Sequence, residues 1–171
     1  DAARDARFAA LVAFAREHSP CYREAYRHVT AGDVAARRVP IVTRQGLMAR
    51  FDDWVTDRAV TRAAVEAFLA DPARIGTRFL DRYAVWKSSG TTGIPGIFLH
   101  DADALATYDA LIAAQLAGPR LAAGVAWGWA VQGARAALIA ATGDHFASIA
   151  SWRRYFGARP WLDARSFSVL K

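Results

Sequence analysis

The chain has 171 residues, 54% of them hydrophobic, and a formal net charge of +6 at pH 7. This length and apolar content suit one globular unit with a real core. The longest uncharged apolar stretch, 121–131, reaches only about half of the roughly 20 residues that a membrane span needs, which excludes a membrane-spanning class, and we expect no membrane partner.

The positive charge is almost entirely arginine. Lysine occurs only at Lys87 and Lys171, and the arginines form only short runs such as 37–38 and 153–154. No zinc-finger, RNA-binding or helix-turn-helix signature accompanies them, so we expect no nucleic acid as a partner. The single cysteine, Cys21, cannot form an internal disulfide, which favours a cytoplasmic protein.

Apolar periodicity predicts two helices in the first part of the chain. A spacing of i, i+3, i+4 and i+7 predicts an amphipathic helix that ends near residues 18–20, with its apolar face at Phe8, Leu11, Val12 and Ala15. The block 61–70 is predicted to form a second helix that Asp71-Pro72 stops, with one side made of Val65, Phe68 and Leu69.

Two strands and a helix are predicted in the middle of the chain. The aromatic and β-branched segment 83–86 and the apolar run 97–99 both have the composition of strands. Asp101 is then expected to cap a helix that Gly118-Pro119 ends, with one apolar stripe made of Leu105, Tyr108, Ile112 and Leu116.

The last part continues the alternation. We predict a buried strand over 136–142 and a helix over 146–156 that Gly157 closes. Strand, helix, strand, helix from residue 96 onward implies an α/β class, with helices packed on a mixed sheet. Four tryptophans are expected to belong to the core, with a surface left bare by truncation as the alternative: Trp127, Trp129, Trp152 and Trp161.

The segment between the two middle strands, 87–96, is the most informative part of the sequence. It holds four hydroxyl side chains and three glycines. Glycine lets main-chain N–H groups approach an anion closely, and serine and threonine hydroxyls add donors without a fixed charge. We therefore predict that this loop binds a polyphosphate, with an ordinary solvated turn as the alternative.

Other phosphate-binding and nucleophile motifs do not fit this segment. A Walker loop needs G-x-x-x-x-G-K-[S/T] before a helix, but Gly90 and Gly93 are only three apart and no lysine follows. The dinucleotide pattern G-x-G-x-x-G is absent. Neither Ser88 nor Ser89 has the flanking glycines of a G-x-S-x-G nucleophile elbow.

The residues 88–95, Ser-Ser-Gly-Thr-Thr-Gly-Ile-Pro, resemble the phosphate-binding signature of the adenylate-forming superfamily of acyl- and aryl-CoA ligases. The resemblance is greatest to its phenylacetate-CoA ligase-like branch. In that family the loop holds the β- and γ-phosphates of ATP while a substrate carboxylate attacks the α-phosphate. Many members end the motif in Pro-Lys, whereas this chain has Pro95-Gly96, a departure that the phenylacetate-type branch often shares.

A second patch resembles the same branch. Its opening pattern, S-P-x-Y-R followed by L-P-x-x-T-K-x-x-L, is similar to residues 18–23 and 39–47, with Arg44 where lysine is usual. The resemblance is strong at 86–96, moderate at 18–47 and weak after residue 120.

The resemblance implies an activity and its participants. ATP with Mg²⁺ and an organic carboxylic acid would give an acyl-adenylate and pyrophosphate, and the acyl group would then pass to a thiol such as CoA. Lys87 could reach a phosphate or could instead be solvated, and no residue is implied as a metal ligand. The implied ATP-binding residues are Ser88, Ser89, Gly90, Thr91, Thr92 and Gly93.

Family members are much longer, with a large N-terminal domain and a small C-terminal lid. We therefore expect residues 1–171 to form a single N-terminal subdomain without the lid, inactive in isolation. The remainder of its own polypeptide would supply the adenine contacts, the acidic residues that place Mg²⁺ and the lid lysine. The alternative is a stand-alone binding or scaffold module with a vestigial phosphate loop.

One further candidate lies just after the predicted strand 136–142, where ligand contacts concentrate in α/β folds. By rough alignment with the phenylacetate-type ligases, His145 is expected to face the substrate carboxylate in the acyl site, beside the positive N-terminus of the following helix. In the alternative, Asp144 caps that helix and His145 is merely exposed.

The remaining reactive side chains fit no catalytic pattern. Cys21 and His18 are three apart with Pro20 between them, so a thiol nucleophile is not expected. The four histidines lack the spacing of a zinc site. Trp86 is expected to pack in a core rather than to stack on a base.

Overall fold

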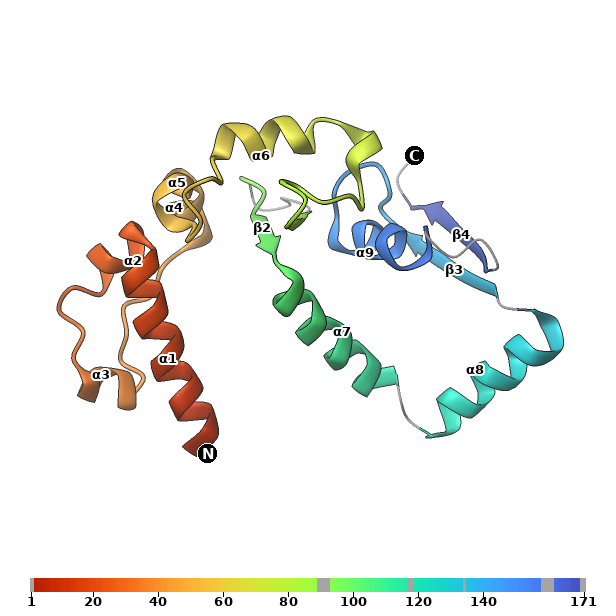
Figure 1. Ribbon diagram of the computed structural model, residues 1–171, viewed down its shortest axis with the longest axis horizontal. Coiled ribbons are helices and arrows are strands. Elements are labelled where there is room, and N and C mark those ends of the chain that lie inside the picture. Colours follow the sequence, from red (N-terminus) through yellow and green to blue (C-terminus); the bar gives the residue numbers. More distant parts are fainter. Residues whose placement is uncertain (1, 89–92, 117–118, 134, 158–161, 170–171) are drawn as a thin grey trace. The chain divides into compact units, whose positions relative to one another are not determined.

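The computed structural model describes residues 2–88, 93–116, 119–133, 135–157 and 162–169 (Figure 1). The chain divides into two compact units, Asp1–Glu66 and Ala67–Lys171. Helices and short strands together place the protein in the α/β class, as predicted. The prediction of a single subdomain within a longer enzyme stays a prediction.

The first unit is helical in the part that the structure describes. The helix predicted to end near residues 18–20 and the helix predicted over 61–70 are both present, whereas the four short helices between them carry too few turns to show a periodicity. The helices are α1 (Ala2–His18), α2 (Pro20–Ala25), α3 (Ala31–Ala35), α4 (Arg44–Ala49), α5 (Phe51–Trp54) and α6 (Arg62–Leu69), whose residues after Glu66 belong to the second unit.

Hydroxyl side chains define where three of these short helices begin. The Ser19 hydroxyl accepts the Tyr22 N–H at 3.4 Å before α2, and the Thr43 hydroxyl accepts the Gly46 N–H at 3.1 Å before α4. Thr30 forms a reciprocal capping box at the start of α3. These caps satisfy N–H groups that a helix leaves without internal partners.

The first unit buries a small core between its helices. Helix α1 packs against α2 and α3, and α2 packs against α5. The buried Ser19 also donates its hydroxyl to the Asp53 carbonyl at 3.1 Å, which ties α2 to α5. Leu11 on the predicted apolar face of α1 is 62% exposed, so that face is only partly covered within the described residues. The most buried apolar side chains are Val12, Met48, Phe51, Val60 and Val65.

The second unit carries all the strands of the described residues. Asp71-Pro72 ends α6, as predicted, and starts a short 3₁₀ helix. The Asp101 carboxylate accepts the Ala104 N–H at 2.9 Å, so the predicted cap of the next helix is confirmed. The elements are η1 (Pro72–Arg74), β1 (Ala84–Lys87), β2 (Ile97–His100), α7 (Ala102–Leu116), α8 (Pro119–Gln132), β3 (Arg135–Ala140), α9 (Ala147–Phe156) and β4 (Asp163–Ser168).

The strands form two separate two-stranded sheets in the described residues, not the one mixed sheet that the sequence predicts. Strands β1 and β2 pair antiparallel, with Val85 opposite Leu99. Strands β3 and β4 pair parallel, with Leu138 opposite Ser166. Periodicity predicts that a segment is extended but not which strand it pairs with, which explains the difference.

Four details of the second unit differ from expectation. Strand β3 alternates between exposed and partly buried residues instead of being buried, and its Ile139 side chain is 73% exposed. Pro119 begins helix α8 instead of only ending the helix before it, as suits proline at a first helical position. Strand β4 was not predicted. Within α7, Leu105 is buried, but Tyr108 and Ile112 are 45% and 42% exposed.

Helix α9 organises the core of the second unit. It contacts both β1 and β3, and its Ile149 is 1% exposed. Gly76 allows the turn after η1 to approach this helix, because its φ is +87° and a Cβ there would lie 2.6 Å from the Cβ of Arg153. The buried cluster consists of Ile75, Ala84, Trp86, Leu105, Ile149 and Ala150.

The tryptophans differ in their surroundings. Trp86 is 9% exposed, so its predicted place in the core is confirmed, and Trp152 packs against the same cluster. Trp127 is 71% exposed, which contradicts its assignment to the core. The predictions for the Trp129 and Trp161 side chains lie outside what the structure describes. Among the described helices, none has both the length and the apolar content to cross a membrane.

Candidate functional site

The predicted phosphate loop is closed at its base by a pair of hydrogen bonds between Ser88 and Gly96. The Ser88 N–H donates to the Gly96 carbonyl at 2.9 Å, and the Gly96 N–H donates to the Ser88 hydroxyl at 2.7 Å. Because β1 and β2 flank these residues as an antiparallel pair, the prediction of a loop between two strands is confirmed. Gly93 is exposed with φ +114°. The predicted sites Ser89, Gly90, Thr91 and Thr92 lie outside the described residues.

Within the described residues, the Ser88 hydroxyl accepts a hydrogen bond and makes no bond as a donor. In its bond to Gly96 the oxygen accepts, and a hydroxyl carries one donor hydrogen besides its acceptor positions. Ser88 can therefore close the loop and donate to an anion at the same time.

Lys87 is fixed at the end of β1 by backbone and side-chain contacts. Its N–H donates to the His145 carbonyl at 2.8 Å, and its ammonium lies 2.5 Å from Oδ2 of Asp144. Phe146 lies beside Lys87 in a parallel backbone pairing. The Lys87 cation is therefore held in an ion pair beside the loop and is not simply solvated.

Asp144 is turned toward Lys87 and not toward the helix that follows. Its second oxygen, Oδ1, accepts the N–H of His145 at 2.7 Å. The residue preceding α9 is Phe146, which provides no side-chain cap. The alternative that Asp144 acts as the cap of this helix is therefore wrong, and its carboxylate serves the pair with Lys87.

His145 is buried, with 1% of its surface exposed. Its Nε2 lies 3.2 Å from the Asp71 carbonyl, and its ring centroid is 5.4 Å from that of Phe68. A carbonyl only accepts, so Nε2 carries the proton in this contact. The alternative of an exposed His145 is wrong. Its contact with a substrate carboxylate stays a prediction, and the geometry itself shows a residue that anchors the segment 144–146.

The imidazole of His100, the last residue of β2, packs against two aromatic side chains. The ring of His100 lies 4.0 Å from Trp86 and 5.3 Å from Tyr108, measured between centroids. Its Nε2 is buried and has no hydrogen-bond partner among the described residues. This burial lowers the pKa of His100 below its ordinary value of 6.5, against a smaller opposing effect of the Asp101 charge.

The protonation of His100 predicts a pH dependence of stability. Its pKa is lower in the folded chain than in the unfolded chain, so between the two values the unfolded chain binds more protons. The free energy of unfolding should be highest above about pH 6.5 and should fall as the pH is lowered from 7 to 5, above the range where carboxylates titrate. Urea unfolding of the wild type and of His100→Phe measures this, and the slope should be smaller in the variant. Equal slopes would contradict the prediction.

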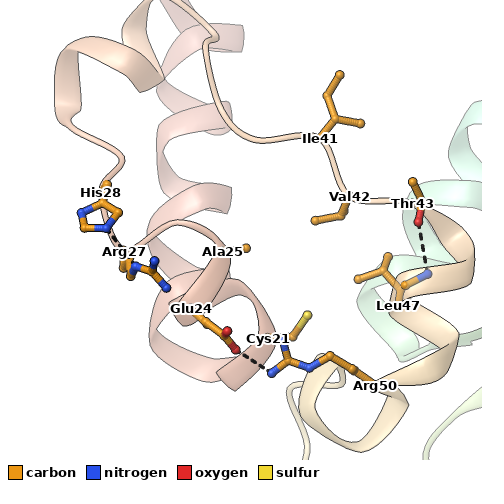
Figure 2. A pocket seen from close by; sticks show the side chains of 11 residues that line it. Cys21, Glu24, Ala25, Arg27, His28, Ile41, Val42, Thr43, Leu47 and Arg50 are labelled. Atoms are coloured by element: carbon orange, nitrogen blue, oxygen red, sulfur yellow. Dashed lines mark hydrogen bonds and ion pairs between the residues drawn. The ribbon is translucent and has the colours of Figure 1, made fainter.

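The first unit contains a pocket of about 440 Å³ (Figure 2). The two segments of the second resemblance, 18–23 and 39–47, both contribute to it, although they are separated in the sequence. At its rim Arg50 pairs with Glu24 at 2.8 Å, and Nε of Arg27 donates to His28 at 2.9 Å. The lining residues are Cys21, Glu24, Ala25, Arg27, His28, Ile41, Val42, Thr43, Gly46, Leu47 and Arg50.

The residues that carry this second resemblance have structural roles in the described chain. Ser19 and Pro20 are the cap and first residue of α2, and Thr43 caps α4. Cys21 is 7% exposed, and burial raises the pKa of its thiol, so a nucleophilic thiolate is disfavoured, as expected. The residues of this second resemblance therefore shape the helices around the pocket, and none of them is identified as a reacting group.

Two long-range pairs were missed by sequence reasoning. Asp144 and Lys87 are 57 positions apart, and the bidentate pair between Asp109 and Arg154, at 2.8 and 3.2 Å, joins α7 to α9 across 45 positions. The hydrogen bond from Arg154 lowers the pKa of the Asp109 carboxyl. A single sequence carries no signal for pairs at such separations.

No family model matches the chain, and comparison with curated proteins and with solved structures found no match. Within the described ranges, no group of three or more His, Cys, Asp or Glu side chains is placed to hold a metal ion.

Proposed function

We propose that this chain forms the phosphate-binding part of an enzyme that activates an organic carboxylate with ATP. The reaction would yield an acyl-adenylate and pyrophosphate, and the acyl group would then pass to a thiol such as CoA. The observation that carries the proposal is the hairpin closed by Ser88 and Gly96, with the cation of Lys87 at its base. The resemblance of residues 88–95 to the adenylate-forming signature gives the reaction type.

The chemistry of the hairpin base suits a polyphosphate. A hydroxyl with a free proton and an ammonium offer a neutral donor and a charged donor to phosphate oxygens. Fixed donors of this kind stabilise charge that develops on a departing pyrophosphate, because they need no reorganisation during the reaction. Ser88 and Lys87 would bind and orient the phosphates, with the hydroxyls of the predicted loop adding donors.

The other participants are assigned to the remainder of the polypeptide. Mg²⁺ is usually held by substrate phosphates with only one or two carboxylates, and we assign these carboxylates to the remainder of the polypeptide. The adenine contacts, the acyl acceptor site and the lid would also lie outside residues 1–171. The buried His145 holds the segment 144–146 beside Lys87, and its place in the acyl site stays part of the proposal.

The isolated chain is expected to show no carboxylate-dependent exchange of labelled pyrophosphate into ATP. An adenylate site open to water, without the lid, lacks the closure on which such chemistry depends. The measurement compares residues 1–171 and a longer polypeptide that contains them, each with a panel of aryl and acyl carboxylic acids and a no-protein control. Exchange by the longer polypeptide alone supports the proposal, and its absence with every acid argues for a binding module. Exchange by residues 1–171 alone would contradict the assignment of adenine and lid contacts to another part.

A further inference from the structure

The ion pair between Lys87 and Asp144 joins two segments whose backbones are already held together. The Lys87 N–H donates to the His145 carbonyl, and Lys87 pairs with Phe146 in a parallel β-bridge. These contacts remain if the ammonium leaves Oδ2 of Asp144. The pair is thus not required to hold the segment 144–146 beside β1.

The pair is also open to exchange with a solute. Both side chains are 29% exposed, so water and small anions can reach them. Ion pairs that water reaches contribute little net stability. A polyphosphate, with several negative charges, can therefore compete with one carboxylate for the ammonium.

The choice of lysine at this position fits such an exchange. Lysine occurs at only two of the 22 Lys and Arg positions of the chain, at Lys87 and Lys171. A lysine is a point charge on a flexible stem, whereas an arginine binds a carboxylate through a rigid fork. The bidentate pair of Arg154 with Asp109 shows the fixed alternative within the same unit.

We propose that Asp144 is a positioning residue that holds the Lys87 ammonium at the end of β1 until a polyphosphate replaces it as the partner of that ammonium. This inference rests on the proposed function, because it assumes that the hairpin base binds phosphate. The ligand chemistry is a chain of phosphates, supplied either by ATP or by free pyrophosphate. Asp144 then lowers the affinity for polyphosphate, because its carboxylate must be displaced.

Calorimetric titration of residues 1–171 with pyrophosphate, ATP and AMP tests the proposal. Asp144→Asn keeps the acceptor for the His145 N–H but removes the charge, and should raise the affinity for pyrophosphate and ATP by about two- to ten-fold. AMP, which has no phosphate chain, should show no such gain. Asp163→Asn is the matched control, because it removes an equal charge from the exposed pair with Arg165 and should leave the affinities unchanged.

The role of Lys87 is tested in the same experiment. Lys87→Met should weaken polyphosphate binding, and adding Asp144→Asn to it should give no gain. Labelling with ¹⁵N-lysine places only two side-chain ammonium groups in the NMR spectrum, and the Lys87 signal should move on addition of pyrophosphate while the Lys171 signal does not. A variant that merely damages the fold would lose affinity, so a gain in affinity separates positioning from structural support.

Three results would overturn the proposal. If Asp144→Asn leaves the affinity unchanged or lowers it, while pyrophosphate still binds the wild type, only the role of Asp144 is wrong. A gain that persists in the Lys87→Met background would show that Asp144 acts on the anion without Lys87. If no variant binds pyrophosphate or ATP, both this inference and the proposed phosphate site fail.

Discussion

Replacing Thr91 and Thr92 together by valine is expected to lower kcat/KM for ATP by about 10-fold to 1000-fold in a longer polypeptide that shows the proposed activity. Valine has nearly the shape of threonine but lacks the hydroxyl, so the change removes two donors from the predicted phosphate loop. The range is the one expected for the loss of one or two donors that act in the transition state. Steady-state kinetics at varied ATP concentration measures it.

The same double variant should fold normally. Because the threonine side chains of this glycine-flanked loop are predicted to be solvated, the change is expected to move Tm by no more than a few degrees. Thr107→Val is a matched control, because Thr107 on α7 donates its hydroxyl to the Asp103 carbonyl of its own helix, outside the hairpin. This control should change kcat/KM by less than about twofold. An unchanged dependence on ATP, or a loss of activity that only follows unfolding, would show that the loop does not handle phosphate.

Truncating Ile149 to alanine is expected to destabilise the chain by about 2–5 kcal/mol. Ile149 lies on α9, is 1% exposed and belongs to the cluster that includes Trp86. Removing its methyl groups loses buried apolar surface and leaves a cavity, which neighbouring side chains fill only in part. Urea unfolding followed by tryptophan fluorescence measures the change.

Ile139→Ala provides the matched control for this substitution. Ile139 lies on β3 and is 73% exposed, so the same chemical change should cost less than about 1 kcal/mol. Similar losses for the two variants would show that α9 is not the centre of the core. Since α9 directly follows the segment 144–146, a loosened α9 should also weaken the contacts of that segment with Lys87.

The location of the candidate site within the chain follows from local sequence signals. A run of hydroxyls and glycines between two apolar segments predicts a loop between strands, and β1 and β2 confirm it. Asp101 before an apolar stripe predicts a cap, and its bond to the Ala104 N–H confirms that cap. Such signals work because a turn, a cap or a periodic face depends on residues only a few positions apart. The adenylate-forming activity rests on the resemblance of residues 88–95 and stays a proposal.

What surrounds the loop was decided by tertiary structure alone. The alternative prediction has Asp144 as a helix cap and His145 exposed, whereas packing turns Asp144 to Lys87 and buries His145 against Phe68. The parallel pairing of β3 with β4 is likewise invisible in either segment by itself. These contacts join residues far apart in the chain, and whether they form depends on how much apolar surface the whole unit buries around α9. Local composition therefore predicted the loop between β1 and β2, and packing decided which charged side chain stands beside Lys87.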